Sequence, residues 1–230
     1  MAHRSTSKRA PRGFAVGVEL ALFTPSDGEL GVLLRVGSDE RSRSRFSLPS
    51  ASLTANQTLD QVAFDLARDV ADAAPAVIEQ VGTFGAPRHT RVDTPKITVV
   101  YFGLLPTGTV VRPAHTWLQA AEAPASLSPR QRDEMDAALN ALRARVDQQP
   151  IAFRLLPATF TLSELQRVYE MLLGRKLHKA SFRRALHAAS LVEATDEWRS
   201  EGRGRPAQLF RYAPPRRRRA RRGVRFDALG

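Results

Sequence analysis

Basic and hydroxyl side chains cluster between positions 176 and 205, and the chemistry they favour is recognition of a polyanion. Four of them lie on a predicted helix over 178–189, outside its apolar positions: Lys179, Ser181, Arg183 and Arg184. These side chains donate hydrogen bonds to phosphates and to base edges, so we expect this face to enter the major groove of DNA. Lys176, Arg203 and Arg205 would add phosphate or minor-groove contacts.

The elements predicted around these residues are typical of a winged helix-turn-helix. Thr161 and Glu164 fit a capping box at the start of a helix that Gly174 ends. Thr161 or Ser163, at that helix start, could offer an amide to a phosphate. After the second helix, residues 191–198 and 208–212 are expected to form strands around a turn rich in glycine and arginine. A helical pair followed by such a hairpin is a more specific pattern for a DNA-binding unit than the pair alone. The alternative is a small packing domain whose basic face is only solvated.

The region before position 150 is expected to mix strands and helices. Alternation over 14–23, the turn at 25–28 and the run 31–36 predict a hairpin, and 77–84 and 97–105 predict further strands. A helix is expected from Leu59, ending because of Pro75. Another is expected over 129–146, with a seam of Met135, Leu139, Leu142 and Val146. That seam would pack on its own domain or, alternatively, form a dimer contact.

Charge is distributed unevenly along the chain. The net charge is +12 over 230 residues, and the last 17 residues hold seven arginines against Asp227. We divide the chain into a basic tail (1–12), a large domain (13–149), a DNA-binding domain (150–213) and an Arg-rich disordered tail (214–230) that would tether DNA without sequence preference. The absence of cysteine excludes disulfides and thiolate metal sites, and no apolar run is long enough to span a membrane. The expected location is the cytoplasm, at the nucleoid.

Several motifs together resemble one known family. Residues 48–53 (LPSASL) and 56–59 (NQTL) are similar to an altered Nudix box. Further matches are 79–85 (EQVGTFG), 100–106 (VYFGLLP), 150–157 (PIAFRLLP), 160–170 (FTLSELQRVYE) and 204–207 (GRPA). Over residues 13–213 the chain resembles the Nudix-related transcriptional regulators of bacterial NAD metabolism, the NrtR family.

The resemblance implies an α+β protein, in which a Nudix-like domain with a mixed sheet between helices (α/β/α) is followed by a winged helix-turn-helix domain. It also implies a homodimeric repressor of NAD synthesis or salvage genes that binds a pseudo-palindromic operator. ADP-ribose or a related NAD metabolite would be the effector, with no cofactor. Fixed cations suit its diphosphate, and the candidates are Arg35, Arg45, Arg88, Arg91 and Lys96.

Catalysis is not expected. Nudix enzymes hold divalent metal with glutamates on one helix face. Aligned without gaps, those positions carry Leu66 and Val70, which cannot bind metal, and an earlier glutamate is replaced by Gln57. A shifted register would use Asp65, Asp69 and Asp72, but these lie about 100° from the apolar stripe, where a solvated face belongs. We therefore assign no catalytic and no metal-binding residue.

Two other interpretations stay open at this point. The chain could be a Nudix hydrolase of nucleoside diphosphate derivatives that carries an appended nucleic-acid-binding module. It could also be an RNA-binding or partner-docking protein. Product formation would distinguish the first from a repressor, and a preference for a palindromic duplex would exclude the second.

Overall fold

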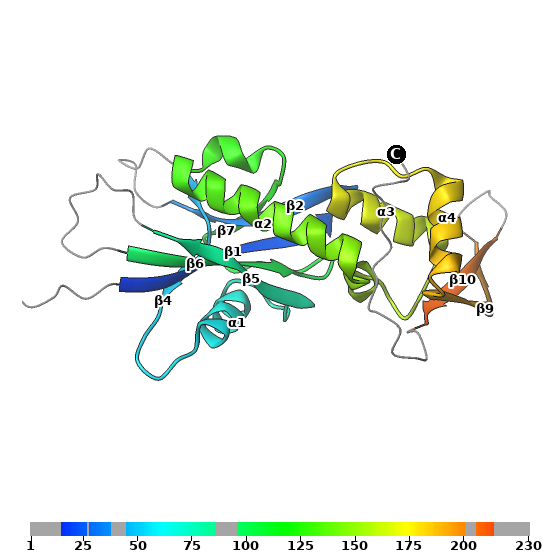
Figure 1. Ribbon diagram of the computed structural model, residues 1–230, viewed down its shortest axis with the longest axis horizontal. Helices are drawn as coiled ribbons and strands as arrows, with labels where there is room; N and C mark the ends of the chain where they lie inside the picture. The colour runs from blue at the N-terminus through cyan, green and yellow to red at the C-terminus, as the bar shows by residue number, and fades with distance from the viewer. Residues whose placement is uncertain (1–14, 27, 38–44, 86–95, 201–205, 214–230) are drawn as a thin grey trace, which may run out of the picture.

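The structure is a computed structural model that describes residues 15–26, 28–37, 45–85, 96–200 and 206–213. It is elongated, with a sandwich of sheet and helices at one end and a winged-helix unit at the other (Figure 1). The α+β architecture predicted from the sequence is confirmed. Among the described residues, no helix is both long and apolar enough to cross a membrane.

The sandwich is built on a seven-stranded mixed sheet. Its main path is β3-β2-β1-β6-β5, with β4 paired to β1 and β7 paired to β2. The strands are β1 Ala15–Ser26, β2 Glu29–Val36, β3 Phe46–Ser47, β4 Ser50–Ser52, β5 Val77–Phe84, β6 Lys96–Leu104 and β7 His115–Gln119. Among the strand pairs of the described residues, only the central one, β1 with β6, is parallel. The predicted hairpin of β1 and β2 is present, and Gly28 takes the positive φ of 86° that its turn requires.

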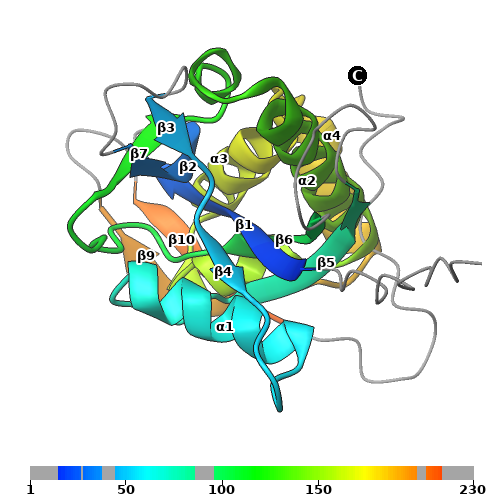
Figure 2. The ribbon, with the colours of Figure 1, turned by 90° about the vertical axis from the view of Figure 1, so that its left-hand side faces the viewer.

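Two helices cover the two faces of this sheet. Figure 2 shows α1 (Leu59–Val70) on one face and α2 (Pro129–Gln148) on the other, which gives the predicted α/β/α layers. Thr58 caps α1 by accepting a hydrogen bond from the Gln61 amide. The prediction that Pro75 ends this helix was wrong. It ends at Val70 because Ala71 turns extended and pairs with Val111.

The short elements of the sandwich were not predicted. These are β3, β4, β7 and a 3-10 helix, η1 (Ala123–Ser126). Strands β3 and β4 have two and three residues, too few for an alternation to be recognised. Their stability comes from pairing with β2 and β1, which are far longer.

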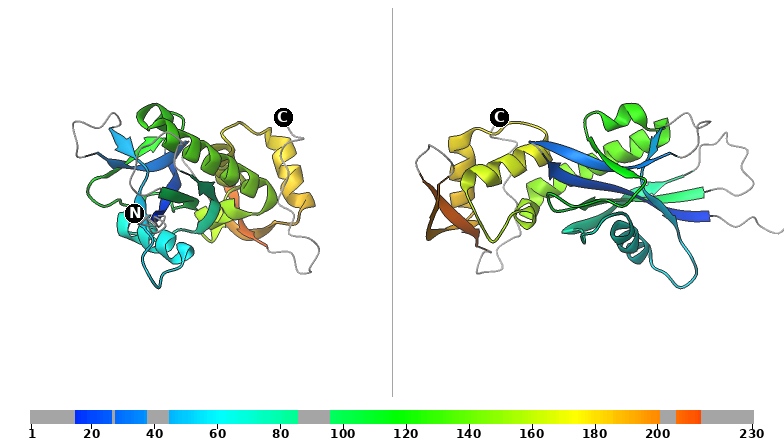
Figure 3. Two further views of the ribbon diagram at one scale, coloured as in Figure 1. Left: turned by 60° about the vertical axis from the view of Figure 1, so that its left-hand side comes forward. Right: turned by 180° about the vertical axis from the view of Figure 1, so that it is seen from behind.

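The C-terminal unit has the expected helix-turn-helix followed by a wing. A 3-10 helix, η2 (Ile151–Leu155), leads through β8 (Thr159–Phe160) into α3 (Leu162–Leu173) and α4 (Lys179–Ala188). The wing strands β9 (Val192–Arg199) and β10 (Ala207–Tyr212) complete a three-stranded sheet in the order β8-β10-β9. Figure 3 shows this sheet at the end of the molecule farthest from α1.

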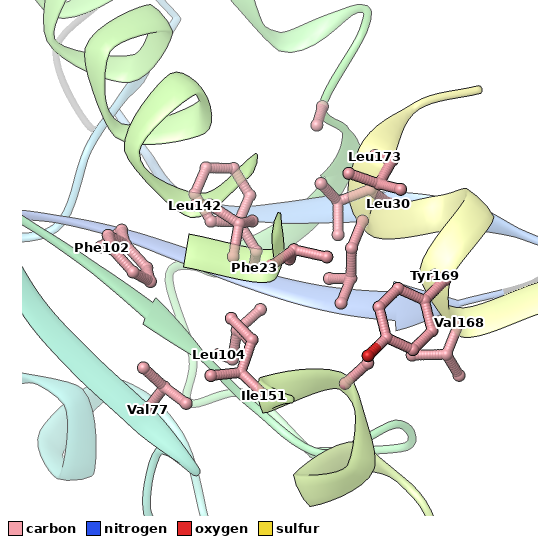
Figure 4. Packing of buried hydrophobic residues seen from close by; sticks show 14 of the residues in the cluster. Phe23, Leu30, Val77, Phe102, Leu104, Leu142, Ile151, Val168, Tyr169 and Leu173 are labelled. Atoms are coloured by element: carbon pink, nitrogen blue, oxygen red, sulfur yellow. The ribbon is translucent and has the colours of Figure 1, made fainter. Parts of the chain in front are cut away.

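One hydrophobic core runs from the sandwich into the winged-helix unit. Of the predicted seam of α2, Met135, Leu142 and Val146 are fully buried within the chain, and Leu139 packs partly buried against the same cluster, so the seam packs internally. The same cluster of buried residues contains Leu30 of β2 and Leu173 of α3, which lie close together in Figure 4. A second, smaller cluster lies under α1. The two ends of the molecule are therefore joined by packing as well as by the chain.

Candidate functional site

The start of α3 is fixed by a complete capping box, as the sequence predicted. The Thr161 amide donates to Glu164 Oε2 at 2.7 Å, and the Glu164 amide donates to Thr161 Oγ1 at 3.1 Å. Arg199 of β9 donates to Glu164 Oε1 at 2.7 Å, which ties the wing to this helix end. Burial alone would raise the pKa of Glu164, but the hydrogen bonds from Thr161 and the charge of Arg199 outweigh it and lower that pKa.

The turn between α3 and α4 is organised by Gly174 and Glu170. Gly174 takes the left-handed conformation, with φ of 68°, and its amide donates to the Glu170 carbonyl at 2.9 Å. The Glu170 carboxylate accepts hydrogen bonds from Gln166, from Lys176 and from the Leu177 amide. Burial acts to raise the pKa of Glu170, and these three donors lower it on balance. The angle between the two helices is thus held by polar contacts that leave the outer face of α4 uncovered.

The predicted DNA-binding residues of α4 lie on or near its outer face. Lys179 and Arg184 are exposed, and Ser181 and Arg183 are partly exposed. Phe182 and Leu186 are fully buried and hold the helix against the unit. Ser181 Oγ lies 3.2 Å from His178 Nδ1, which sits at the N-cap position. Lys176, in the turn between α3 and α4, is also exposed.

The remaining predicted DNA contacts are Thr161 and Ser163, which the structure describes, and Arg203 and Arg205, which it does not. Ser163 is exposed at the start of α3, whereas Thr161 is buried and both its amide and its hydroxyl are used by the capping box.

Sequence reasoning missed Trp198, which is 61% exposed near the end of β9. It lines a hollow of about 210 Å³ together with Ser163, Arg183 and Gln208. The sequence shows only a tryptophan between the charged residues Glu197 and Arg199, and its exposure is a finding of the structure.

The predicted effector-binding cations are placed only in part. Arg35 and Arg45 are both exposed and flank the pairing of β2 with β3, where Gly37 donates to the Arg45 carbonyl at 2.8 Å. The Arg45 guanidinium lies 5.6 Å from the centre of the Phe46 ring. Lys96 begins β6, and its side chain is outside the described part of the structure, as are Arg88 and Arg91.

A polar cleft beside the start of α1 was also not predicted. It has a volume of about 540 Å³ and is lined by Asp60, Ile78, Glu79, Gln80, Tyr101 and Arg145. Tyr101 donates to Asp60 Oδ1 at 2.6 Å, and Arg145 of α2 pairs with Glu79 of β5. Burial first, and then the Asp60 carboxylate, raise the pKa of the Tyr101 hydroxyl far above its usual range. It therefore stays protonated and acts as a donor.

Comparisons with known proteins agree on both ends of the molecule. The family model described as the NrtR DNA-binding winged helix domain matches residues 152–212. The ADPR responsive transcriptional repressor NtrR of Acinetobacter baylyi is 31% identical over 205 residues, covering 85% of this chain and 81% of that protein. The chain belongs to the NrtR family.

Solved structures extend this result to the fold of the NrtR-family chain. Shewanella oneidensis NrtR complexed with a 27mer DNA matches with a TM-score of 0.70 and 26% identity, over 86% of this chain and 93% of that one. A MutT/nudix family protein from Enterococcus faecalis matches with a TM-score of 0.65 and 16% identity, over 87% of each chain. The similarity to the Enterococcus faecalis protein, at 16% identity, shows a shared fold only.

In this NrtR-family chain, α1 buries the two positions that an ungapped alignment with the Nudix box assigns to metal-binding glutamates. Leu66 and Val70 face the sheet and are 9% and 4% exposed. Asp65 and Asp69 lie exposed on the opposite side, and Asp72 accepts a hydrogen bond from the Val110 amide at 3.0 Å. Within the described residues, no group of three or more His, Asp or Glu side chains is placed to hold a metal ion.

Proposed function

We propose that this chain is a DNA-binding transcriptional repressor of NAD synthesis or salvage genes whose N-terminal sandwich responds to ADP-ribose or a related NAD metabolite. The observation that carries the proposal is the uncovered face of α4 beside the wing, in a winged-helix unit that the NrtR family model matches. The Acinetobacter relative is named as an ADPR-responsive repressor, and the Shewanella relative is solved with DNA. A repressor acts on the chromosome, so we place the protein at the nucleoid.

On this proposal the residues of α4 contact different parts of the DNA. Arg184 and Lys179 contact base edges in the major groove, while Ser181 and Arg183 contact bases or phosphates. Lys176, Arg203 and Arg205 contact phosphates or the minor groove. At the start of α3, the Ser163 amide is the better phosphate donor, because the Thr161 amide is already paired with Glu164. A homodimer would present two such faces to a pseudo-palindromic operator.

We place the effector at the sandwich end, with Arg35, Arg45, Arg88, Arg91 and Lys96 as the candidate diphosphate ligands. Arg35 and Arg45 support this because both are exposed and lie across one short strand pair. Arginine holds a diphosphate without a metal ion by donating two parallel hydrogen bonds.

The deciding experiment is a gel-shift of the full chain with the DNA upstream of its own gene, with and without ADP-ribose. We expect a specific complex that a scrambled duplex does not compete for and that ADP-ribose changes in amount. Failure to prefer the upstream duplex over the scrambled one would reject the repressor. A specific complex that ignores ADP-ribose would reject only the effector.

We also propose that the Nudix-like sandwich is not a hydrolase. Leu66 and Val70 offer no metal ligand, and Asp72 is engaged with the Val110 amide. Purified protein incubated with ADP-ribose and Mg²⁺ or Mn²⁺ should therefore release no AMP. Metal-dependent release that Asp69→Asn abolishes would instead support the hydrolase with an appended nucleic-acid-binding module.

A further inference from the structure

A cavity of about 430 Å³ lies where the sandwich meets the winged-helix unit. Its walls come from three places: the β1–β2 turn at Gly28–Leu30, the segment after β7 at Gln119–Ala121, and the facing helices α2 and α3. Figure 3 shows the β1–β2 hairpin reaching α3, and α3 contacts both strands. The volume is at the small end of the range for sites that bind small molecules.

The lining of this junction cavity combines cationic and apolar side chains, and both helices contribute one of each at a spacing of four residues, Leu139 with Arg143 on α2 and Arg167 with Met171 on α3. The basic side chains are Arg143, Arg167, Arg175 and Lys176, and the apolar ones are Leu30, Ala120, Leu139 and Met171. Two carboxylates, Glu29 and Glu170, also line it. Glu170 is engaged with Gln166, Lys176 and the Leu177 amide, so this carboxylate and Lys176 offset each other and the helical side keeps the positive charge of its arginines. This combination suits a ligand with an anionic group at one end and a flat apolar group at the other.

Arg143 has a buried N–H group, its Nε, that lacks a hydrogen-bond acceptor among the described residues. Its Nη2 lies 2.8 Å from the point where a Cβ on residue 174 would stand, a space that exists because residue 174 is glycine. A buried N–H without an acceptor is unfavourable, and a guanidinium matches the oxygens of a phosphate.

We propose that the junction cavity binds a mononucleotide, with its phosphate at Arg143 and Arg167 and its base between Leu139 and Met171. Thioether sulfur packs favourably on aromatic rings, which suits Met171 to a base. The cavity volume suits one nucleotide better than the larger ADP-ribose. The site lies away from Arg35 and Arg45, so the inference stands independently of the proposed ADP-ribose response.

Such a ligand would connect the two ends of the molecule. It would contact α2 of the sandwich and α3 of the winged-helix unit, next to the turn that sets the position of α4. If the ligand favours one arrangement of these helices, DNA affinity must change with ligand binding, and ligand affinity must change equally with DNA binding.

The test is calorimetry of the full chain with AMP, adenosine and inorganic phosphate as separate probes. We expect AMP to bind at least tenfold more tightly than either fragment. Arg143→Gln and Arg167→Gln should each weaken AMP binding about tenfold. Arg167 is exposed on α3, so its substitution leaves the core intact. The matched control is Arg132→Gln, an exposed arginine of α2 outside the cavity, which should bind AMP like the parent protein.

Four results would overturn the proposal. These are no AMP heat at millimolar ligand, AMP affinity unchanged in both cavity variants, phosphate binding as tightly as AMP, and loss of ADP-ribose binding in Arg143→Gln. The last would mean that the cavity is the ADP-ribose site itself. Unchanged ADP-ribose binding in both variants would support a separate nucleotide site.

Discussion

Glu164 connects three parts of the winged-helix unit through one carboxylate. It caps α3 through Thr161 and receives Arg199 from the wing, and its side chain is 24% exposed. Since its pKa is lowered in the folded protein, the ionised form stabilises the fold. That contribution is complete above the ordinary pKa of about 4.5 and disappears as the pH falls through the lowered folded value.

We therefore predict that Glu164→Gln lowers the urea midpoint at pH 7 and that its difference from the parent protein shrinks below about pH 4.5. Glutamine can still accept the Thr161 amide, so the loss reports mainly on the charge facing Arg199. Glu197→Gln, an exposed change on β9, is the control and should match the parent protein at both pH values. A pH-independent gap for Glu164→Gln would contradict the assignment.

Arg184 is the side chain of α4 whose loss tests DNA recognition most directly. It is exposed on α4 while the neighbouring apolar face is buried, so its loss should leave the fold unchanged. Arg184→Ala should weaken operator binding by about 1–3 kcal/mol, measured by fluorescence anisotropy at fixed salt. Arg132→Ala on α2 removes the same charge far from α4 and should leave the affinity unchanged. Equal affinities for the two variants would mean that α4 is placed wrongly.

The turn at the C-terminal end of α3 determines where α4 begins. Gly174 ends the helix with a φ of 68°, and the following residues fold back so that Glu170 accepts the Leu177 amide. A side chain with a Cβ is strained in this conformation by about 1–2 kcal/mol. The guanidinium of Arg143 would also have to move, although it is the flexible end of its side chain.

Gly174→Ala should therefore lower the free energy of unfolding by about 1–2 kcal/mol in urea titrations. Gly174→Asn should lose less, because asparagine tolerates the left-handed conformation. The control is Gly82→Ala in β5, where the nearest atom is 4.0 Å from the new Cβ and no positive φ is required. A loss for Gly82→Ala as large as that for Gly174→Ala would remove the conformational explanation.

What the sequence could and could not predict depends on whether an element is stabilised locally or by a distant partner. Residues that stabilise their own element were found, such as Thr161 with Glu164, Gly174, and the apolar stripe of α1. Elements that depend on a distant partner were missed: β3 and β4 are too short, at two and three residues, to show a period of their own, and β7 is a five-residue strand paired with the distant β2. The contact of Tyr101 with Asp60 was missed because the two residues are 41 positions apart and no local pattern connects them.

At the scale of the whole molecule, the shared core limits how a signal can pass from the sandwich to DNA. Leu142 of α2, Leu30 of β2 and Leu173 of α3 belong to one buried cluster, so the two ends cannot swing freely within one chain. An effector would then act by shifting each chain as a unit relative to its partner in the proposed dimer. The ligand can shift that balance only by its difference in affinity for the two arrangements.

A shared core also predicts that the chain unfolds as one unit. The sequence has two tryptophans, and the structure places Trp117 on β7 of the sandwich and Trp198 on β9 of the wing. Trp198→Phe and Trp117→Phe leave one fluorescent reporter at each end. At constant protein concentration, both variants should show the same urea midpoint, which should agree with circular dichroism.

Leu142→Ala, introduced into each single-tryptophan protein, should then move both midpoints together. Leu142 is fully buried in the shared cluster, and removing such a side chain costs about 2–5 kcal/mol. Leu53→Ala is the control, because Leu53 packs only against the smaller cluster under α1 and is partly exposed, so it should cause a smaller shift. If Leu142→Ala moved the Trp117 transition and left that of Trp198 in place, the two ends would be separate folding units. The core would then transmit no constraint to α4, and the effector would need another route to DNA.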